Sequence, residues 1–276
     1  MTAFVKGHGL GNDYLVLDQR DLAFPLTAAA VVRLCDRHRG VGSDGILLLV
    51  DSTTADFGLR IFNPDGTEAE KSGNGVRIFA KYLYDHGRAS TPAFRIETRG
   101  GPVACECRVD GGRVRAVAVE MGHVTFRDGG RDLRLEVGGS VLTATALSVG
   151  NPHCVLFVDE LDDGQVHRLG PLLERHAAFP DRTNVQFARV ESPEQLAIRI
   201  WERGAGYTLA SGTSSCAAAA AAVRKGRCAF GRVTVVMPGG GLEVDVRPDW
   251  SLRLSGPVEE IATGTLSPDF IAALRE

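Results

Sequence analysis

The segment Asn63-Pro-Asp-Gly-Thr-Glu-Ala-Glu-Lys-Ser-Gly-Asn-Gly75 is the stretch around which the rest of the chain is organised. Its composition predicts the end of a strand, a tight turn, and a helix whose first turn is small, polar and rich in glycine. The first N–H groups of a helix have no partner within the helix and carry partial positive charge, so they attract carboxylates and phosphates. We therefore expect an anion-binding site where this helix begins.

The same design occurs a second time, late in the chain. The segment Trp201-Glu-Arg-Gly-Ala-Gly-Tyr-Thr-Leu-Ala-Ser211 leads into an alanine-rich helical pattern. Glu202 precedes Ser211 by the same spacing at which Asn63 precedes Ser72. Two polar residues that each open a helix, one in each half of the chain, predict a two-sided site built by duplication.

Composition narrows the class of protein. The chain has 276 residues, of which 44% are hydrophobic, and a formal net charge of −3. This length allows two domains with substantial cores, and the balanced charge disfavours a nucleic-acid binder. The N-terminus lacks a signal-peptide pattern, no apolar run is long enough to cross a membrane, and only four lysines could carry a pyridoxal cofactor. We expect a cytoplasmic protein whose six scattered cysteines stay reduced.

Apolar periodicity and turn residues predict an α+β fold in which strands outnumber helices. Helices are expected over residues 28–39, 74–86, 165–176, 211–225 and 268–274. Strands are expected over residues 4–6, 14–18, 46–50, 58–62, 94–98, 103–109, 113–121, 133–137, 141–149, 155–158, 184–190, 196–201, 233–237, 242–246 and 252–255. A polar turn is expected to interrupt a strand around residues 149–154, and the two halves are expected to meet near residues 118–125.

The cysteines do not indicate a metal site. Cys105 and Cys107 lack a second pair at ligand spacing, so we interpret them as alternate residues on one face of a strand. Cys216 lies five residues into the second predicted helix, where we expect it to pack in the core rather than act as a nucleophile. No metal or organic cofactor is predicted.

Motifs along nearly the whole chain resemble those of the diaminopimelate epimerase family. They are His8-Gly-Leu-Gly-Asn12-Asp-Tyr14, Asn63 to Glu68, Gly73-Asn-Gly75, Gly150-Asn-Pro-His153 followed later by Asn184, and Glu202-Arg-Gly-Ala-Gly-Tyr-Thr208. The resemblance implies two pseudo-symmetric domains, each a mixed or antiparallel β-barrel-like sheet around a central helix. It places them at residues 1–120 with a C-terminal tail at 264–276, and at residues 121–263.

The resemblance also implies an activity, a substrate and an assembly. Such enzymes are isomerases that interconvert LL- and meso-diaminopimelate, an amino acid of lysine and peptidoglycan biosynthesis, without a cofactor. The implied partners are this small-molecule substrate and a second copy of the chain in a homodimer, with no nucleic acid and no membrane. The active site is expected in the cleft between the two domains.

The resemblance assigns roles to individual residues. Two cysteines of the family transfer the α-proton on opposite faces of the substrate, and this chain has Ser72 and Ser211 at those positions. His153 and Glu202 are expected to tune this acid–base pair. Backbone N–H groups are expected to bind the reacting carboxylate, and polar side chains the other substrate groups. The residues so implicated are Gly73, Asn74, Gly212 and Thr213 for the carboxylate, and Asn12, Asn63, Asn151, Asn184, Glu202 and Arg203 for the rest.

Serine changes the expected chemistry and leaves several interpretations open. A thiol titrates near ~8.5, whereas a serine hydroxyl is a poor base unless a neighbouring base takes its proton. The chain could be an engineered double exchange, a natural enzyme that uses His153 and Glu202 as its bases, or an amino-acid-binding protein without turnover. A related isomerase of the phenazine-biosynthesis type would use Glu202 as acid and base. Each asparagine alone could merely stabilise a turn, but four in matching motifs favour ligand binding.

Overall fold

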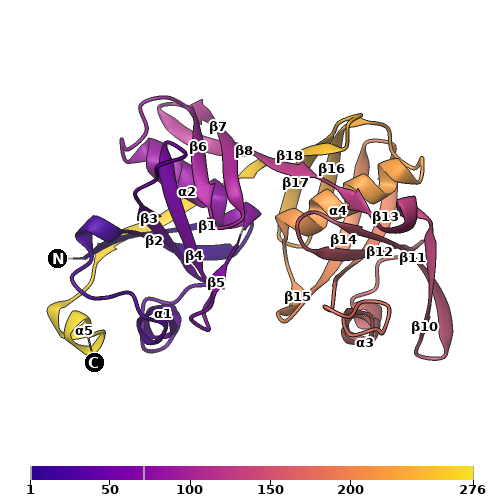
Figure 1. The fold of residues 1–276 in the computed structure, drawn as a ribbon, viewed down its shortest axis with the longest axis horizontal. Helices are drawn as coiled ribbons and strands as arrows, with labels where there is room; N and C mark the ends of the chain where they lie inside the picture. Colours follow the sequence, from indigo (N-terminus) through magenta and orange to yellow (C-terminus); the bar gives the residue numbers. More distant parts are fainter. Residues whose placement is uncertain (1, 71, 276) are drawn as a thin grey trace. The chain divides into compact units, whose positions relative to one another are not determined.

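The computed structural model of the chain describes residues 2–70 and 72–275. These residues form two compact units (Figure 1). The first contains the described residues up to Val119 and those from Gly256 onward, and the second contains Glu120–Ser255. We describe each unit by itself.

The described residues of the first unit combine a mixed sheet with three α-helices and one 3₁₀ turn. Its strands are β1 (Ala3–Gly9), β2 (Asn12–Asp18), β3 (Ile46–Val50), β4 (Phe57–Phe62), β5 (Glu68–Ala69), β6 (Ala93–Thr98), β7 (Gly101–Asp110), most of β8 (Arg113–His123), and β19 (Glu259–Thr265). Its helices are the 3₁₀ turn η1 (Gln19–Asp21), α1 (Ala28–Cys35), α2 (Gly73–Asp85) and α5 (Pro268–Ala273). Strands β2 and β3 are parallel, as are β4 and β6, whereas β1–β2, β3–β4, β4–β5, β6–β7 and β7–β8 are antiparallel.

The second unit is built in the same way. Its strands are β9 (Thr125–Phe126), β10 (Asp132–Val137), β11 (Ser140–Ser148), β12 (Pro152–Phe157), β13 (Asn184–Ser192), β14 (Gln195–Glu202), β15 (Gly206–Thr208), β16 (Gly231–Met237), β17 (Gly240–Val246) and most of β18 (Ser251–Pro257). Its helices are the 3₁₀ turn η2 (Arg127–Gly130), α3 (Asp163–Glu174) and α4 (Gly212–Arg224).

The order of pairings repeats between the units. Parallel strands β2 and β3 are joined through α1, as parallel strands β12 and β13 are joined through α3. Parallel strands β4 and β6 are joined through α2, and β14 and β16 through α4. The repeat places Asn63 directly after β4 and Glu202 at the end of β14, each shortly before a long helix.

Helices α2 and α4 are each surrounded by strands of their own unit (Figure 1). Residues 73–83 of α2 and 216–223 of α4 are all buried. A helix that is buried on every side belongs to the core, and the alanines of α4 allow strands to approach it closely. Cys216 is fully buried in α4, as expected, and Cys105 and Cys107 are both buried in β7.

Helix α1 is shorter than the sequence predicted. Thr27 caps its start, because Thr27 Oγ1 accepts a hydrogen bond from Ala30 N at 3.1 Å. The helix ends at Cys35 rather than at residue 39. Asp36 takes an extended conformation, and its carboxylate accepts hydrogen bonds from the N–H groups of His38 and Arg39 at 2.7 and 2.8 Å. This side chain replaces the helical hydrogen bonds and closes a turn instead.

One further expectation about strands was wrong, and one strand was not predicted. Residues 149–151 do not interrupt one strand but connect the antiparallel strands β11 and β12, with Ser148 opposite Pro152 and Gly150 at a φ of +89°. Strand β19 was not predicted because most of its side chains are exposed and show no apolar alternation. It is held by backbone pairing with β1, and this pairing returns the chain to the first unit from Gly256, earlier than the expected residue 264.

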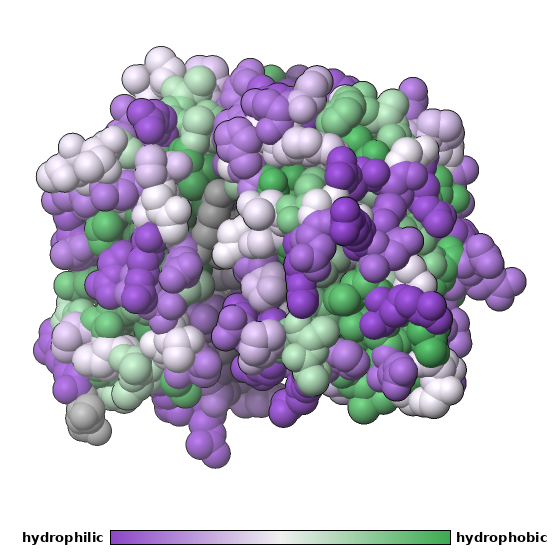
Figure 2. Space-filling model, turned by 45° about the vertical axis from the view of Figure 1, so that its right-hand side comes forward, coloured by the Kyte–Doolittle hydropathy of each residue, from purple (hydrophilic) through white to green (hydrophobic). Residues whose placement is uncertain are grey.

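The surface mixes polar and apolar side chains. On the face shown in Figure 2, small hydrophobic patches lie among hydrophilic residues. The most exposed large apolar side chains include Leu209 and Val141, and single exposed apolar residues are usual in folded proteins. None of the helices within residues 2–70 and 72–275 combines the length and apolar character needed to cross a membrane.

Candidate functional site

Ser72 caps the start of α2 and leaves two backbone donors without a partner. Its Oγ accepts a hydrogen bond from Gly75 N at 3.0 Å, and its carbonyl accepts one from Val76 N at 2.9 Å. Within the described part of the chain, the N–H groups of Gly73 and Asn74 have no acceptor. A β-carbon on Gly75 would lie 3.2 Å from Ser72 Oγ and 2.9 Å from a methyl group of Leu47, so glycine keeps this turn tight. The start of α2 therefore offers the free backbone donors that the predicted anion site requires, and anion binding there stays a prediction.

Asn12 and Asn74 lie together beside this helix start. Asn74 Nδ2 donates to Asn12 Oδ1 at 3.2 Å, and Asn74 Oδ1 accepts from Arg77 Nη2 at 2.9 Å. Arg77 is fully buried, and its other Nη group donates to the carbonyl of Gly73 at 3.2 Å. A buried guanidinium stays charged, so it adds positive potential to the first turn of α2. The sequence reasoning missed Arg77.

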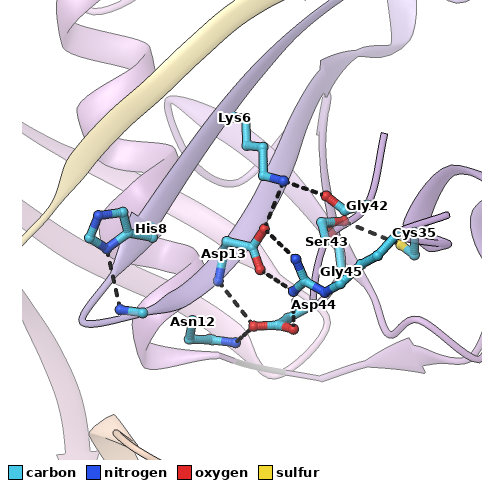
Figure 3. A network of polar contacts seen from close by, with 11 residues as sticks. Lys6, His8, Asn12, Asp13, Cys35, Gly42, Ser43, Asp44 and Gly45 are labelled. Carbon is cyan, nitrogen blue, oxygen red and sulfur yellow. Dashed lines mark hydrogen bonds and ion pairs between the residues drawn. The ribbon is translucent and has the colours of Figure 1, made fainter. Parts of the chain in front are cut away.

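A charged network holds Asn12 from the other side (Figure 3). Asn12 Nδ2 donates to Asp44 Oδ2 at 3.0 Å, and Arg37 donates to both Asp44 and Asp13, at 2.7 and 2.6 Å. Lys6 Nζ lies 3.1 Å from the Asp13 carboxylate. Burial disfavours the charged form of Asp13, but hydrogen bonds from Arg37 and Lys6 outweigh it and lower its pKa. Both ends of the Asn12 amide are therefore fixed by the protein.

Asn63 is held within its own turn. Its Nδ2 donates to Thr67 Oγ1 at 2.9 Å, and the Thr67 hydroxyl donates in turn to Asp65 Oδ1 at 2.6 Å. This is the turn-stabilising role that a lone asparagine commonly has. A substrate contact for Asn63 stays a prediction.

Ser211 caps α4 in the same manner as Ser72 caps α2. Its Oγ accepts from Ser214 N at 3.4 Å, and its carbonyl accepts from Ser215 N at 3.1 Å and from Ser215 Oγ at 2.8 Å. The N–H groups of Gly212 and Thr213 have no acceptor among the described residues. The second predicted anion site therefore has the same backbone geometry as the first.

The Glu202 carboxyl lies near the Ser211 hydroxyl. Burial raises the pKa of the Glu202 carboxyl, and a hydrogen bond with Ser211 acts in the opposite direction. A carboxylate next to a hydroxyl is the arrangement that makes serine a usable base, because the carboxylate takes the proton that the hydroxyl loses. Of the two predicted sites, the second thus has a base beside its serine.

His153 is a neutral, fully buried residue that orients its neighbours. Gln186 Nε2 donates to His153 Nδ1 at 3.0 Å, so the proton of the neutral ring is on Nε2, which lies 2.9 Å from Asn151 Oδ1. Burial lowers the pKa of His153 to about 3, although the Gln186 hydrogen bond favours the charged form. Gln186 also donates to Ser214 Oγ at 3.0 Å. These contacts hold the His153 ring between two amides, and its expected part in tuning the acid–base pair stays a prediction.

Asn184 begins β13 and is bonded to the loop after β14 that contains Arg203. Asn184 Nδ2 donates to Pro152 O, and Asn184 Oδ1 accepts from Arg203 N, both at 3.0 Å. Glu174 accepts from Gly204 N at 3.1 Å and from Trp201 Nε1 at 2.9 Å. Asn184 thus connects the Asn151 turn to the Glu202 loop, and Glu174 fixes that loop from α3.

The structure brings most of the predicted residues into two groups. In the first unit these are Asn12, Ser72, Gly73 and Asn74; in the second they are Asn151, His153, Asn184, Glu202, Arg203, Ser211, Gly212 and Thr213. Arg77, Asp44, Gln186 and Glu174 were missed. Only Gln186 had a sequence signal, since strand alternation places it on the same face as Asn184.

Comparisons with known proteins identify the family of the chain. The sequence model of the family described as diaminopimelate epimerase matches residues 4–127 and 145–259. "Diaminopimelate epimerase 2" of Nostoc sp. is 45% identical over 98% of this chain and 97% of its own length. The chain belongs to the diaminopimelate epimerase family. A diaminopimelate epimerase of Pelotomaculum thermopropionicum is 46% identical over 95% of this chain and 97% of its own length.

Solved structures share the α+β fold of this family member at low sequence identity. A hydroxyproline epimerase from Agrobacterium vitis has a TM-score of 0.72 at 15% identity, covering 97% of this chain and 93% of that one. A phenazine biosynthesis protein of the PhzF family from Bacillus anthracis has a TM-score of 0.72 at 14% identity, covering 96% and 99%. At such identities the likeness shows the fold alone.

Proposed function

We propose that this chain is a diaminopimelate epimerase that interconverts LL- and meso-diaminopimelate by two-base proton transfer, without an organic cofactor, in lysine biosynthesis. The observation that carries the proposal is the start of α4, where the cap residue Ser211 precedes two unpartnered backbone donors and lies near the Glu202 carboxyl. It is supported by the names of relatives that match nearly the whole chain.

The proton transfer follows from this arrangement. Ser211 Oγ takes the α-proton of the substrate while the Glu202 carboxylate takes the Ser211 hydroxyl proton, so no free alkoxide forms. Ser72 donates a proton to the opposite face of the same carbon. Inversion without a cofactor needs such a pair of groups, because the carbanion must be protonated on the face that did not lose the proton.

The two helix starts would stabilise the charge that develops on the substrate carboxylate. The donors are the N–H groups of Gly73 and Asn74 on α2, and of Gly212 and Thr213 on α4. One preorganised donor of this kind contributes roughly 10²–10³-fold to a rate, so four donors supply a large part of the catalysis. Arg77 adds its buried positive charge to the α2 donors.

The remaining polar residues would hold the distal amino-acid end of the substrate. Asn12, Asn63, Asn151, Asn184 and Arg203 are proposed contacts, with Glu202 contacting the substrate beside Ser211. His153 would act by fixing the Asn151 amide oxygen, which leaves the Asn151 amide hydrogens for a substrate oxygen.

We further propose that the two units are pseudo-symmetric, barrel-like halves around α2 and α4, and that the protein is a cytoplasmic homodimer. The repeated strand order supports the first point, and the six buried thiols fit a reducing compartment. Light scattering of the purified protein tests the dimer, since a mass near that of one chain contradicts it.

The activity is tested by incubating the protein with LL-diaminopimelate and separating the stereoisomers chromatographically. Appearance of the meso isomer is the expected result. Calorimetric binding of the substrate without conversion would contradict the proposal and indicate an amino-acid-binding protein. Full activity in Ser211→Ala would instead indicate that Glu202 transfers the proton directly, as in the phenazine-type alternative.

A further inference from the structure

Ser72 has a phenol where Ser211 has a carboxylate. Ser72 Oγ lies 3.3 Å from Tyr14 Oη, and its other hydrogen bond within the described residues comes from Gly75 N. The Tyr14 contact is longer than an ideal O–H···O bond, but catalytic hydrogen bonds are often long before substrate binds. Neither the sequence motifs nor the site described so far gave Tyr14 a role.

The fold holds the Tyr14 ring in one position. Tyr14 lies in β2, two residues after Asn12, and only 7% of it is exposed. A β-carbon on Gly45 would lie 2.7 Å from Cε1 of the ring, and Gly45 O accepts a hydrogen bond from Leu15 N at 3.0 Å. Gly45 therefore lets β3 pack directly against the ring. The phenol is fixed next to Ser72 by packing.

We propose that Tyr14 is the proton-relay residue of the Ser72 side, an inference that rests on the proposed epimerase function. When Ser72 gives its hydroxyl proton to the substrate carbon, Tyr14 gives its phenolic proton to Ser72 Oγ. The net result is that the substrate gains one proton and Tyr14 becomes a phenolate, which regains a proton from water. Meanwhile the α-proton has moved through Ser211 to Glu202, which releases it to water.

The chemistry of the two partners explains why a serine can serve on each side. An ordinary phenol has a pKa near ~10, far below that of an aliphatic alcohol, so a phenolate is a much better anion to leave behind than an alkoxide. At neutral pH a phenol holds its proton and a carboxylate accepts one. The Tyr14–Ser72 pair therefore donates a proton while the Glu202–Ser211 pair accepts one. In the reverse reaction the protonated Glu202 carboxyl is the donor and the Tyr14 phenolate is the acceptor.

The test is Tyr14→Phe, measured in D2O with LL- and meso-diaminopimelate supplied separately. Inversion should fall by about 10²–10⁴-fold in both directions, the usual contribution of an acid–base group. The intact Glu202–Ser211 side should still exchange the α-proton of one stereoisomer for deuterium without inverting it. Tyr84→Phe, a matched change on α2 of the same unit, should invert at the normal rate.

A second variant separates a proton relay from a structural role. A thiol, with a pKa near ~8.5, has no need of the phenol, so Ser72→Cys in the Tyr14→Phe background should restore inversion. Unchanged inversion in Tyr14→Phe would overturn the inference. So would equal loss of exchange with both stereoisomers, or failure of the double variant when Ser72→Cys alone is active. A wild-type protein without inversion or exchange would overturn the proposed function itself.

Discussion

At the scale of single residues, two acid–base candidates that could not be told apart in the sequence have different surroundings in the fold. Glu202 and His153 both look like acid–base candidates, but Glu202 lies near a serine hydroxyl whereas both ring nitrogens of His153 contact amides. Burial raises the pKa of Glu202 and lowers that of His153. In both cases burial favours the neutral form, but only the carboxyl lies next to a group that can transfer a proton.

Glu202 should set the acid limb of the activity profile. It must be ionised to take the Ser211 proton. Because its pKa is raised, kcat/KM should begin to fall at a pH above the ordinary titration range of a carboxyl group. Glu202→Gln should lower kcat by about 10²–10⁴-fold and abolish this limb. Rates measured between pH 4 and 8 check the prediction. An unchanged acid limb in the variant would assign it to another group.

His153 should make the protein less stable in mild acid. In the unfolded chain a histidine gains a proton near pH ~6.5, but in the folded protein His153 does so only near about 3, so falling pH favours unfolding over this window. The free energy of unfolding should therefore drop by about 2 kcal/mol between pH 7 and 5 through this residue alone.

Urea unfolding of the wild type and of His153→Asn at the two pH values measures this contribution. The variant is expected to be less stable at pH 7, because Gln186 and Asn151 lose a partner, but to depend less on pH. An identical pH dependence in both proteins would show that His153 is protonated without unfolding.

At the scale of elements, the two helix starts depend on supports that lie elsewhere in the sequence. Sequence patterns predicted both starts to within one residue, because a cap serine followed by glycine is a local signal. They could not predict Glu174 or Asp44, whose partners are distant in sequence. Tertiary contacts of this kind leave no periodic trace.

Glu174 should be a strong contributor to the stability of the second unit. Glu174→Ala leaves Trp201 Nε1 and Gly204 N without their acceptor, at a cost of about 0.5–1.5 kcal/mol for each lost hydrogen bond. The same change should raise KM, because the loop that carries Arg203 loses its anchor. Urea unfolding and steady-state kinetics measure both effects. Glu160→Ala, a change at an exposed acid, is the control, and equal stability of the two variants would refute the anchor.

At the scale of the whole molecule, much of the architecture could be predicted from the sequence. The elements that could not be predicted were missed for physical reasons. The apolar strands and both buried helices follow from periodicity, and the duplication follows from the repeated spacing of Asn63–Ser72 and Glu202–Ser211. Strand β19 could not be predicted, because backbone pairing with β1 holds it rather than an apolar face. The end of α1 depended on one Asp36 side chain.

The family assignment covers the whole chain, but the chemistry depends on two side chains. A serine pair can work only if each hydroxyl has a partner that exchanges its proton, and the structure provides Glu202 for Ser211 and Tyr14 for Ser72. Exchange of both serines for cysteines should raise the rate by orders of magnitude, because thiols need less assistance.

The most direct test is deuterium exchange at the α-carbon of LL-diaminopimelate in D2O, followed by NMR for the wild type and for Ser72→Cys/Ser211→Cys. We predict that the wild type incorporates deuterium and forms the meso isomer, more slowly than the double variant. Exchange by the double variant with none by the wild type would contradict the account, because it would show that the serines of this chain bind the substrate without moving its proton.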